Sequence, residues 1–296
     1  MEAEVEKFIL FLKFDLRLSG NTVDSYKNDL NKYISFLLND KDISNLNSIS
    51  YDDIRAYISY LSINKNKPSS VNRNISSIKK FHLYLFDNNI TINNPSELLE
   101  SQKNRRNFPS TLSVVEIEKI FESIDTRSAI GLRDLSILSL LYSSGMRVSE
   151  LVGLEFSNIF FDEEYIKIMG KGKKERLVPI GLKAKKHLES YIQNVRNNLN
   201  ISKSKGCVFL SYRSNPLTRM VIFNIIKKYC LLAGIDKKVS PHTFRHSFAT
   251  HMLEGGADLR IVQELLGHEN ISTTEIYTHL DRTYLKEVHK LCHPRG

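Results

Sequence analysis

A polar stretch at residues 101–109 divides the chain into two parts. Its sequence, SQKNRRNFP, is basic and closes on a proline, a composition typical of an exposed linker. With 296 residues, the chain is long enough for two ordinary domains of about 150 residues each. We therefore predict a first domain at residues 1–100, a linker at 101–109 and a larger second domain at 110–296.

The first part is patterned as a helical bundle. Apolar residues recur at helical spacing over residues 21–38, 51–61 and 69–86, and turns rich in Ser, Asn and Pro separate these segments. Polar side chains at Asn21–Asp24 offer an N-cap for the first of them. The sequence NNP at residues 93–95 then ends the bundle.

The second part combines helices with a short hairpin. A capping box, Ser113 to Glu116, precedes a helix that ends near residue 124. Short apolar or alternating runs at 165–169 and 176–180 flank the sequence GKGKKE, which predicts an antiparallel hairpin with a basic tip. The other predicted helices cover residues 130–144, 183–199, 219–233, 242–253, 258–266 and 272–277. The fold class is therefore mainly α, with a small helical bundle and a larger α-rich domain that holds a small antiparallel β-sheet.

The charge is distributed unevenly along the chain. There are 42 Lys and Arg residues against 33 Asp and Glu, a formal net charge of +9. Residues 1–108 carry 15 basic and 13 acidic groups (+2), whereas residues 109–296 carry 27 and 20 (+7). A concentrated basic excess indicates a polyanionic partner, because Lys and Arg release counterions from phosphates. Charge that merely confers solubility is the alternative.

Several classes of protein are disfavoured. No stretch approaches the roughly 18 apolar residues of a membrane span, and the acidic amphipathic N-terminus lacks the basic region of a signal peptide. The three cysteines are scattered and form no C-x-x-C pair, which disfavours a disulfide framework or a zinc ribbon. We expect a cytoplasmic protein that does not bind a membrane.

Two familiar ligand sites are also disfavoured. The sequence GKGKK at residues 170–174 has neither the spacing nor the hydroxyl of a P-loop. His242, His246 and His251 lie on one predicted helix, but no Glu follows His242 and no Cys lies nearby. We therefore expect neither a metal nor a cofactor.

Two segments offer cations to a phosphate. Arg147 follows a helix-ending Gly, and Glu150 is spaced to orient it through a bidentate bond. A surface ion pair is the alternative for these two residues. Lys171 lies between two glycines at the hairpin tip, from which it can reach into a site, unless the tip is simply a solvated turn.

Three further segments add polar groups. His242 and Arg245 lie three residues apart on one helical face, and Pro241 begins that helix. His268 directly follows a helix that ends at a glycine. Tyr277 lies in a short helix behind a capping box, where a tyrosine usually packs with its hydroxyl in water.

Taken together, these segments resemble the tyrosine recombinases, the phage-integrase-like family of site-specific DNA recombinases. That family has the pattern Arg…Lys…His-x-x-Arg…His…Tyr. The strings GMRVSEL, GKGKKERLVPI, PHTFRHSFATHML and LLGHENISTTEIYTH are similar to it, as are SSVNRNISSIKKFHLYL and NNPSELL in the first part. The resemblance covers nearly the whole chain, and no catalytic position departs from the pattern. The six matching residues are Arg147, Lys171, His242, Arg245, His268 and Tyr277.

The resemblance implies a mechanism without metal or ATP. Tyr277 would attack the scissile phosphate to form a 3′-phosphotyrosyl link, and Lys171 would protonate the departing 5′-oxygen. Arg147 and Arg245 would bind the non-bridging oxygens, where negative charge collects in the transition state. The two histidines would add hydrogen bonds and help to move the proton of the nucleophile. Glu150 would hold Arg147 in place.

The resemblance also implies partners. The family acts on double-stranded DNA as tetramers, here of this chain alone or with a paralogous recombinase, and passes a C-terminal helix to a neighbouring protomer. Residues 281–296 fit such a helix, which would otherwise fold back on its own domain. A C-shaped clamp of the two domains would surround the duplex. Outside the active site, the residues expected to contact DNA are Arg73, Lys79, Lys80, Lys173, Lys174 and Arg176.

Within the family, the chain is most similar to the Xer recombinases, which resolve chromosome dimers and can depend on a septal DNA translocase. A mobile-element integrase or resolvase would share the same catalysis. A DNA-binding protein that has lost catalysis would lack part of the catalytic set, and a type IB topoisomerase would not carry these motif strings.

Overall fold

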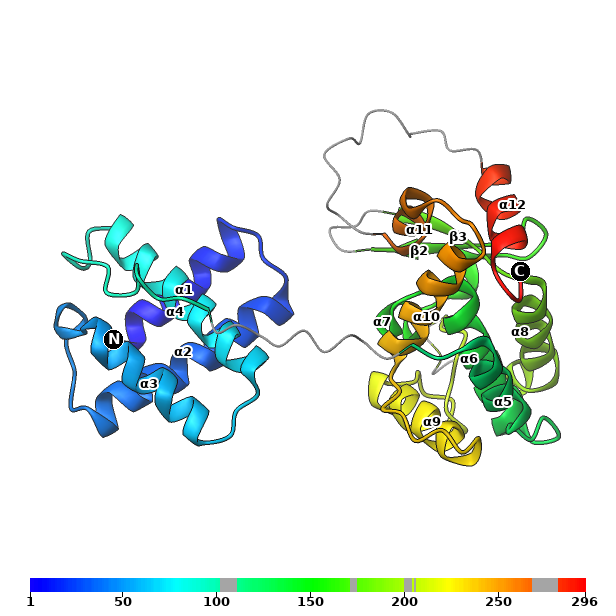
Figure 1. The fold of residues 1–296 in the computed structure, drawn as a ribbon, viewed down its shortest axis with the longest axis horizontal. Coiled ribbons are helices and arrows are strands. Elements are labelled where there is room, and N and C mark those ends of the chain that lie inside the picture. Colours follow the sequence, from blue (N-terminus) through cyan, green and yellow to red (C-terminus); the bar gives the residue numbers. More distant parts are fainter. Residues whose placement is uncertain (102–110, 171–174, 200–203, 205, 268–281) are drawn as a thin grey trace. The chain divides into compact units, whose positions relative to one another are not determined.

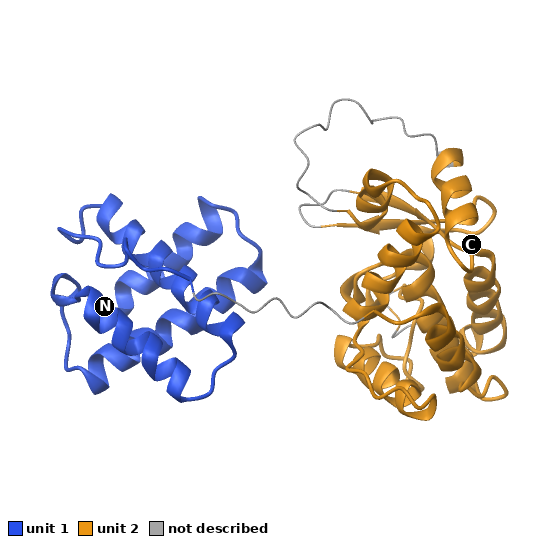
Figure 2. Cartoon of the chain, viewed as in Figure 1, with its two compact units in different colours: residues 1–107 blue, residues 108–296 orange. Residues whose placement is uncertain are grey.

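The structure is a computed structural model that describes residues 1–101, 111–170, 175–199, 204, 206–267 and 282–296. It divides into two compact units, residues 1–107 and 108–296 (Figure 2). The border falls within the predicted linker, most of which lies outside the described residues.

Unit 1 is a bundle of helices, as the apolar periodicity predicts (Figure 1). Ser19 caps α2, Ser50 forms a capping box with Asp53 at the start of α3, and a proline begins α4. The apolar faces of these helices meet in one core that includes Phe8, Leu30 and Phe81. The helices are α1 (Glu2–Phe14), α2 (Gly20–Asp40), α3 (Tyr51–Ile63) and α4 (Pro68–Asp87), with a 3₁₀ turn at Leu46–Ser48.

A polar network crosses the core of unit 1. The carboxylate of Asp29 on α2 is almost fully buried, and Arg73 on α4 donates two hydrogen bonds of 2.8 Å to it. Asn74 and Ser77 each donate a further bond of 3.2 Å. A buried carboxylate needs such partners, so the network links α2 to α4.

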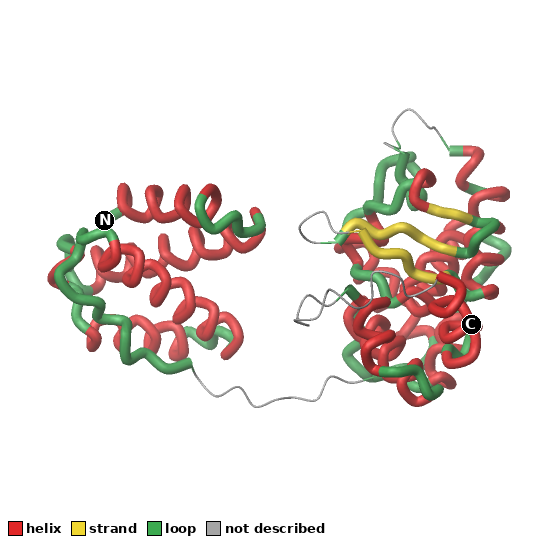
Figure 3. The backbone as a smooth tube through the Cα atoms, turned by 90° about the horizontal axis from the view of Figure 1, so that it is seen from above, coloured by secondary structure: helices red, strands yellow, loops and turns green. Residues whose placement is uncertain are grey.

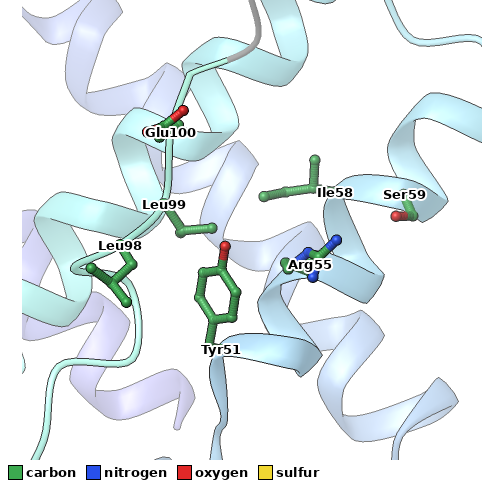
Figure 4. Close-up of a pocket in the computed structure, with 7 residues that line it drawn as sticks. All are labelled: Tyr51, Arg55, Ile58, Ser59, Leu98, Leu99 and Glu100. Carbon is green, nitrogen blue, oxygen red and sulfur yellow. The ribbon is translucent and has the colours of Figure 1, made fainter.

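Unit 1 also has a pocket of about 340 Å³, which lies between α3 and residues 98–100 near the C-terminal end of the unit (Figure 4). None of the candidate site residues lines it. Its lining residues are Tyr51, Arg55, Ile58, Ser59, Leu98, Leu99 and Glu100.

Unit 2 is built around α6, in which every residue from Asp134 to Ser144 is buried. Helices α5, α8 and α10 pack against it, α12 contacts its C-terminal end through His289, and the sheet packs to one side (Figures 1 and 3). The elements of unit 2 are α5 (Val114–Glu122), α6 (Ala129–Ser144), α7 (Val148–Val152), β1 (Ile159–Phe160), β2 (Tyr165–Met169), β3 (Glu175–Pro179), α8 (Leu182–Asn194), α9 (Arg219–Leu232), α10 (Pro241–Glu254), α11 (Leu259–Leu266) and α12 (Arg282–Cys292), with 3₁₀ turns at Phe156–Asn158 and Arg196–Asn198.

The sheet contains the predicted hairpin and one strand more. Strands β2 and β3 pair antiparallel with Ile168 opposite Arg176, and the short strand β1 pairs with β2. The mainly helical class with a small antiparallel sheet is therefore confirmed. The helical periodicity did not reveal α7 or β1, because each is too short to show a period. The predicted helix at 272–277 lies outside the described residues.

Helix α12 lies on its own chain. It packs against α10 and β3, and Leu285 joins the apolar cluster of α10 and α11. His289 on α12 is buried, and its Nε2 donates a 2.7 Å hydrogen bond to the carbonyl of Ser143 at the end of α6. In this single chain, α12 therefore packs on its own domain, and its donation to a neighbouring protomer stays a prediction.

Among the described helices, none combines the length and the apolar character that a membrane span requires.

Candidate active site

Arg147 lies at the turn between α6 and α7. Gly145 ends α6 in the left-handed conformation (φ 57°), and a Cβ there would come within 2.4 Å of Phe248. Only glycine fits this close turn, which brings Arg147 to the cap of α7 two residues later. The backbone nitrogen of Arg147 donates to Glu150 Oε2 (2.6 Å), and its Nη1 donates to Oε1 (3.0 Å). The predicted pairing of Arg147 with Glu150 is present, but it is not the predicted bidentate bond, because only Nη1 of the guanidinium contacts the carboxylate while Nη2 binds elsewhere.

Arg245 enters the same region from α10. Its side chain is buried and donates from Nη1 to the carbonyl of Gly145 (2.7 Å) and from Nη2 to the carbonyl of Leu266 (2.6 Å). Arg147 donates from Nη2 to the carbonyl of Gly267 (3.2 Å). Two guanidinium groups that are 98 residues apart in the sequence therefore bind neighbouring carbonyls at the end of α11.

The electrostatics of this pair suit an anion. Burial, and after it the positive charge of Arg147, lowers the pKa of Arg245 to about 10, so the guanidinium stays charged at neutral pH. Burial alone would raise the pKa of Glu150, but hydrogen bonds from Arg176 and Arg147 outweigh it and lower that pKa below its ordinary value. Glu150 is therefore a fixed negative charge beside the arginines.

His242 lies in the first turn of α10, which begins at Pro241 as predicted. Its side chain is exposed, whereas Arg245, one turn later, is buried. The remaining predicted catalytic residues Lys171, His268 and Tyr277, together with Lys173 and Lys174, lie outside the described residues. Two of these positions directly follow described elements: residue 171 comes two after β2, and residue 268 follows Gly267, which caps α11.

Arg176 is placed differently from its prediction as a cation that contacts DNA. Its side chain is only 11% exposed and forms a bidentate ion pair with Glu150, with distances of 2.9 and 2.8 Å. The strand pattern carries a signal for this position. Arg176 alternates in phase with the buried Val178, so it lies on the inner face of the sheet.

The three cations predicted on α4 differ in their surroundings. Arg73 binds the buried Asp29, and Lys79 donates to the carbonyls of Glu97 and Leu99. Lys80 is exposed. Contact of these residues with DNA stays a prediction.

No metal centre is apparent: the described part of the chain has no group of three or more His, Cys, Asp or Glu side chains that could hold an ion.

This fold, with paired arginines at the end of a helix, is that of a tyrosine recombinase, an enzyme that cuts and rejoins DNA strands. Residues 110–283 match the phage integrase family and residues 5–89 match the N-terminal SAM-like domain of phage integrases, so the chain belongs to this family. It is 43% identical over 295 residues to the tyrosine recombinase XerD of Chlorobaculum tepidum. The aligned residues cover 99% of this chain and 96% of that relative.

Two solved structures share the fold. One is the XerH site-specific recombinase bound to its difH substrate in a pre-cleavage complex, with a TM-score of 0.69, 22% identity and coverage of 97% of this chain and 83% of that chain. The other is a lambda integrase tetramer bound to a Holliday junction, with a TM-score of 0.70, 17% identity and coverage of 92% and 78%. The chain is thus a site-specific recombinase in class.

Proposed function

We propose that this recombinase resolves chromosome dimers at a specific DNA site, with Tyr277 as the nucleophile. The pairing of Arg147 with Arg245 at the end of α11 carries the proposal, because it offers two fixed cations to one phosphate. The likeness to XerD over the whole chain supports the choice of substrate. The protein would act in the cytoplasm, where the chromosome lies.

In the proposed reaction, the two guanidinium groups bind the non-bridging oxygens of the scissile phosphate. The phenol oxygen of Tyr277 attacks the phosphorus and loses its proton with the help of His242 and His268. The bond to the 5′-oxygen breaks, and Lys171 protonates that oxygen. A 3′-phosphotyrosyl link and a free 5′-hydroxyl result, so the phosphodiester energy is conserved for rejoining.

The arginines are held ready for this step. Arg245 donates hydrogen bonds to the carbonyls of Gly145 and Leu266, and Arg147 donates one to the carbonyl of Gly267. Each guanidinium nevertheless has five N–H donors. Donors therefore remain for a phosphate. Arg147 also donates from Nη1 to Glu150, whose carboxylate is itself bound by Arg176. Since the partners are backbone carbonyls and a carboxylate that is held in place, binding requires little reorganisation.

We further propose that four protomers assemble on two duplexes, as this chain alone or with a paralogous recombinase. The lambda integrase tetramer on a Holliday junction supports this number. Exchange of α12 between protomers would then require it to leave the site that it occupies on its own chain. Activation by a septal DNA translocase belongs to the same proposal, as does contact of Lys80, Lys173 and Lys174 with the DNA backbone.

Covalent trapping tests the reaction. The protein is incubated with a nicked duplex that carries a candidate dimer-resolution site, and the mixture is denatured in SDS. We expect a slowly migrating protein–DNA species with the wild type and none with Tyr277→Phe. Relaxation of supercoiled DNA that lacks any such site would instead indicate a topoisomerase. If a library of sites gives DNA binding but no covalent species, with or without a paralogue, the chain is not the proposed enzyme.

A further inference from the structure

The guanidinium group of Arg176 donates three hydrogen bonds within the site, whereas those of Arg147 and Arg245 each donate two among the described residues. Its Nη1 and Nη2 donate to the two oxygens of Glu150, and its Nε donates to the carbonyl of Leu265 (3.1 Å). The side chain is 11% exposed, whereas that of Arg147 is 42% exposed. Burial alone does not distinguish Arg176, because Arg245 is only 6% exposed. The difference is that all three guanidinium nitrogens of Arg176 donate to protein acceptors, whereas among the described residues Arg245 donates from Nη1 and Nη2 only.

The bidentate pair with Arg176 fixes the carboxylate of Glu150. A planar guanidinium that binds both oxygens sets the plane as well as the position of the carboxylate. The same two oxygens accept hydrogen bonds from the backbone nitrogen and Nη1 of Arg147. The orientation of Arg147 therefore depends on Arg176 through Glu150.

The end of α11 joins all three arginines. The last carbonyls of a helix lack partners within it and attract cations. Here, three consecutive carbonyls each accept a hydrogen bond from an arginine of a different element: Leu265 from Arg176 on β3, Leu266 from Arg245 on α10, and Gly267 from Arg147 before α7. The spacing of these carbonyls sets the spacing of the guanidinium groups.

Gly267 brings the chain close to Arg176. It has a left-handed conformation (φ 67°), and a Cβ there would come within 3.0 Å of Cδ and 3.2 Å of Nε of Arg176. The chain turns against the side chain of Arg176 at the residue before His268. Arg176 is also the second residue of β3, which begins four positions after Lys171 in the sequence.

We propose that Arg176 is a positioning residue for strand cleavage. It holds Glu150 and the end of α11, so that Arg147 and Arg245 keep the spacing that a phosphate requires, and it acts through them without touching DNA. This inference rests on the proposed function, because its readout is the cleavage reaction.

The first test separates positioning from DNA contact. Arg176→Gln and Arg176→Lys are compared with the wild type in single-turnover cleavage of the nicked site and in DNA binding at 50–200 mM salt. A displaced catalytic group can slow a reaction about 100-fold, so we expect cleavage on the order of 10–100-fold slower in both variants. We expect a DNA Kd within about threefold of wild type and an unchanged salt slope, because no phosphate contact is lost.

Lysine distinguishes the two roles further. It keeps the charge but lacks the planar fork, so it cannot bind both oxygens of Glu150. A residue that contacts a phosphate would be rescued by lysine, and its loss in Arg176→Gln would reduce the salt slope by about one. Wild-type cleavage by Arg176→Lys, together with a reduced salt slope in Arg176→Gln, would overturn the inference.

A double-mutant cycle tests the route through Glu150. If Arg176 acts through Glu150, adding Arg176→Gln to Glu150→Gln should slow cleavage by less than about threefold, since the interaction is already lost. Multiplicative effects would show that Arg176 does not act through Glu150, and that part of the inference would fall, leaving only its contact with the Leu265 carbonyl at the end of α11.

Arg196→Lys is the matched control for folding. Arg196 is another buried arginine of unit 2, and it donates to the carbonyls of Cys207 and Val208 without contact to the site. We expect Arg196→Lys to lower the melting temperature while leaving the cleavage rate of the folded protein unchanged. Equal slowing in Arg196→Lys and Arg176→Lys would reduce the role of Arg176 to general stability.

The outcomes also separate this inference from the proposed function. Absence of a covalent species with the wild type would overturn the proposed function itself. A wild-type covalent species that forms equally fast with Arg176→Gln would overturn only the role of Arg176.

Discussion

At the scale of single residues, Glu150 is the side chain that holds two of the three arginines of the site. One carboxylate accepts four hydrogen bonds from two arginines, and its charge offsets part of the repulsion among three clustered guanidinium groups. A neutral amide of the same shape can accept through only one atom, and its NH₂ group would face donors. The geometry therefore requires a carboxylate and not merely a polar side chain.

Glu150→Gln should consequently slow cleavage without abolishing DNA binding. Because Arg147 loses its charged acceptor and shifts from its position, we expect single-turnover cleavage on the order of 10–100-fold slower. DNA affinity should change little, since Glu150 does not itself bind DNA. Covalent trapping on the nicked site and a mobility-shift titration measure the two quantities.

Glu155→Gln provides the control, because it removes the same charge from an exposed residue five positions later. We expect wild-type cleavage from it. Equal cleavage rates for Glu150→Gln and the wild type would remove the role of Glu150.

The residues of the site were predictable from the sequence to different degrees. The pairing of Arg147 with Glu150 is local, three residues apart, so spacing alone predicted it. The pairing of Arg176 with Glu150 joins a strand to a distant turn, and it depends on how β3 packs beside α11. No local pattern contains that packing, and Arg176 was predicted to contact DNA, although its alternation with Val178 is a signal that would have placed its side chain on the inner face.

At the scale of elements, most long periodic segments were predictable and short ones were not, although the 13-residue helix α1 was not among the predicted segments. The capping box at Ser113 and the glycine after α11 marked real helix ends. In contrast, α7 holds five residues and β1 holds two, so tertiary contacts define them. The position of α12 likewise depends on its buried contacts with α10, β3 and the end of α6.

Those contacts make the docking of α12 sensitive to acid. Burial lowers the pKa of His289 from 6.5 to about 4, and it lowers the pKa of the stacked His293 well below its ordinary value. In the unfolded chain these histidines take up protons near pH 6.5, whereas in the folded chain they remain neutral until a much lower pH. Stability is therefore full above pH 6.5 and falls as the pH decreases toward 4.

We expect a loss on the order of 1–2 kcal/mol from His289 between pH 7 and pH 5, which corresponds to several degrees in melting temperature. Melting curves over this range measure it. His289→Gln should be less stable at pH 7 but should lose less on acidification than the wild type. Leu285→Ala, which shortens a buried apolar side chain of the same helix, should be less stable at each pH but should keep the wild-type pH dependence. An identical pH dependence in His289→Gln would contradict the assignment.

At the scale of the whole molecule, the two units differ in charge but each has its own core. Unit 1 carries +2 and unit 2 carries +7, and separate apolar clusters fill them. Electrostatic attraction to DNA should therefore reside mainly in unit 2. Unit 1 would add its contacts as a tethered second module, whose effective concentration is set by the chain between the units.

Separation of the units tests this division. We expect residues 108–296 alone to fold and to keep most of the salt dependence of DNA binding, since that slope follows the number of phosphates neutralised. Their affinity should nevertheless fall by about 100-fold or more, because the tethered module is lost. Adding residues 1–107 as a separate chain at equal concentration should not restore it. Equal affinity of residues 108–296 and the intact chain would show that unit 1 does not bind DNA, and it would remove Lys80 from the proposed contacts.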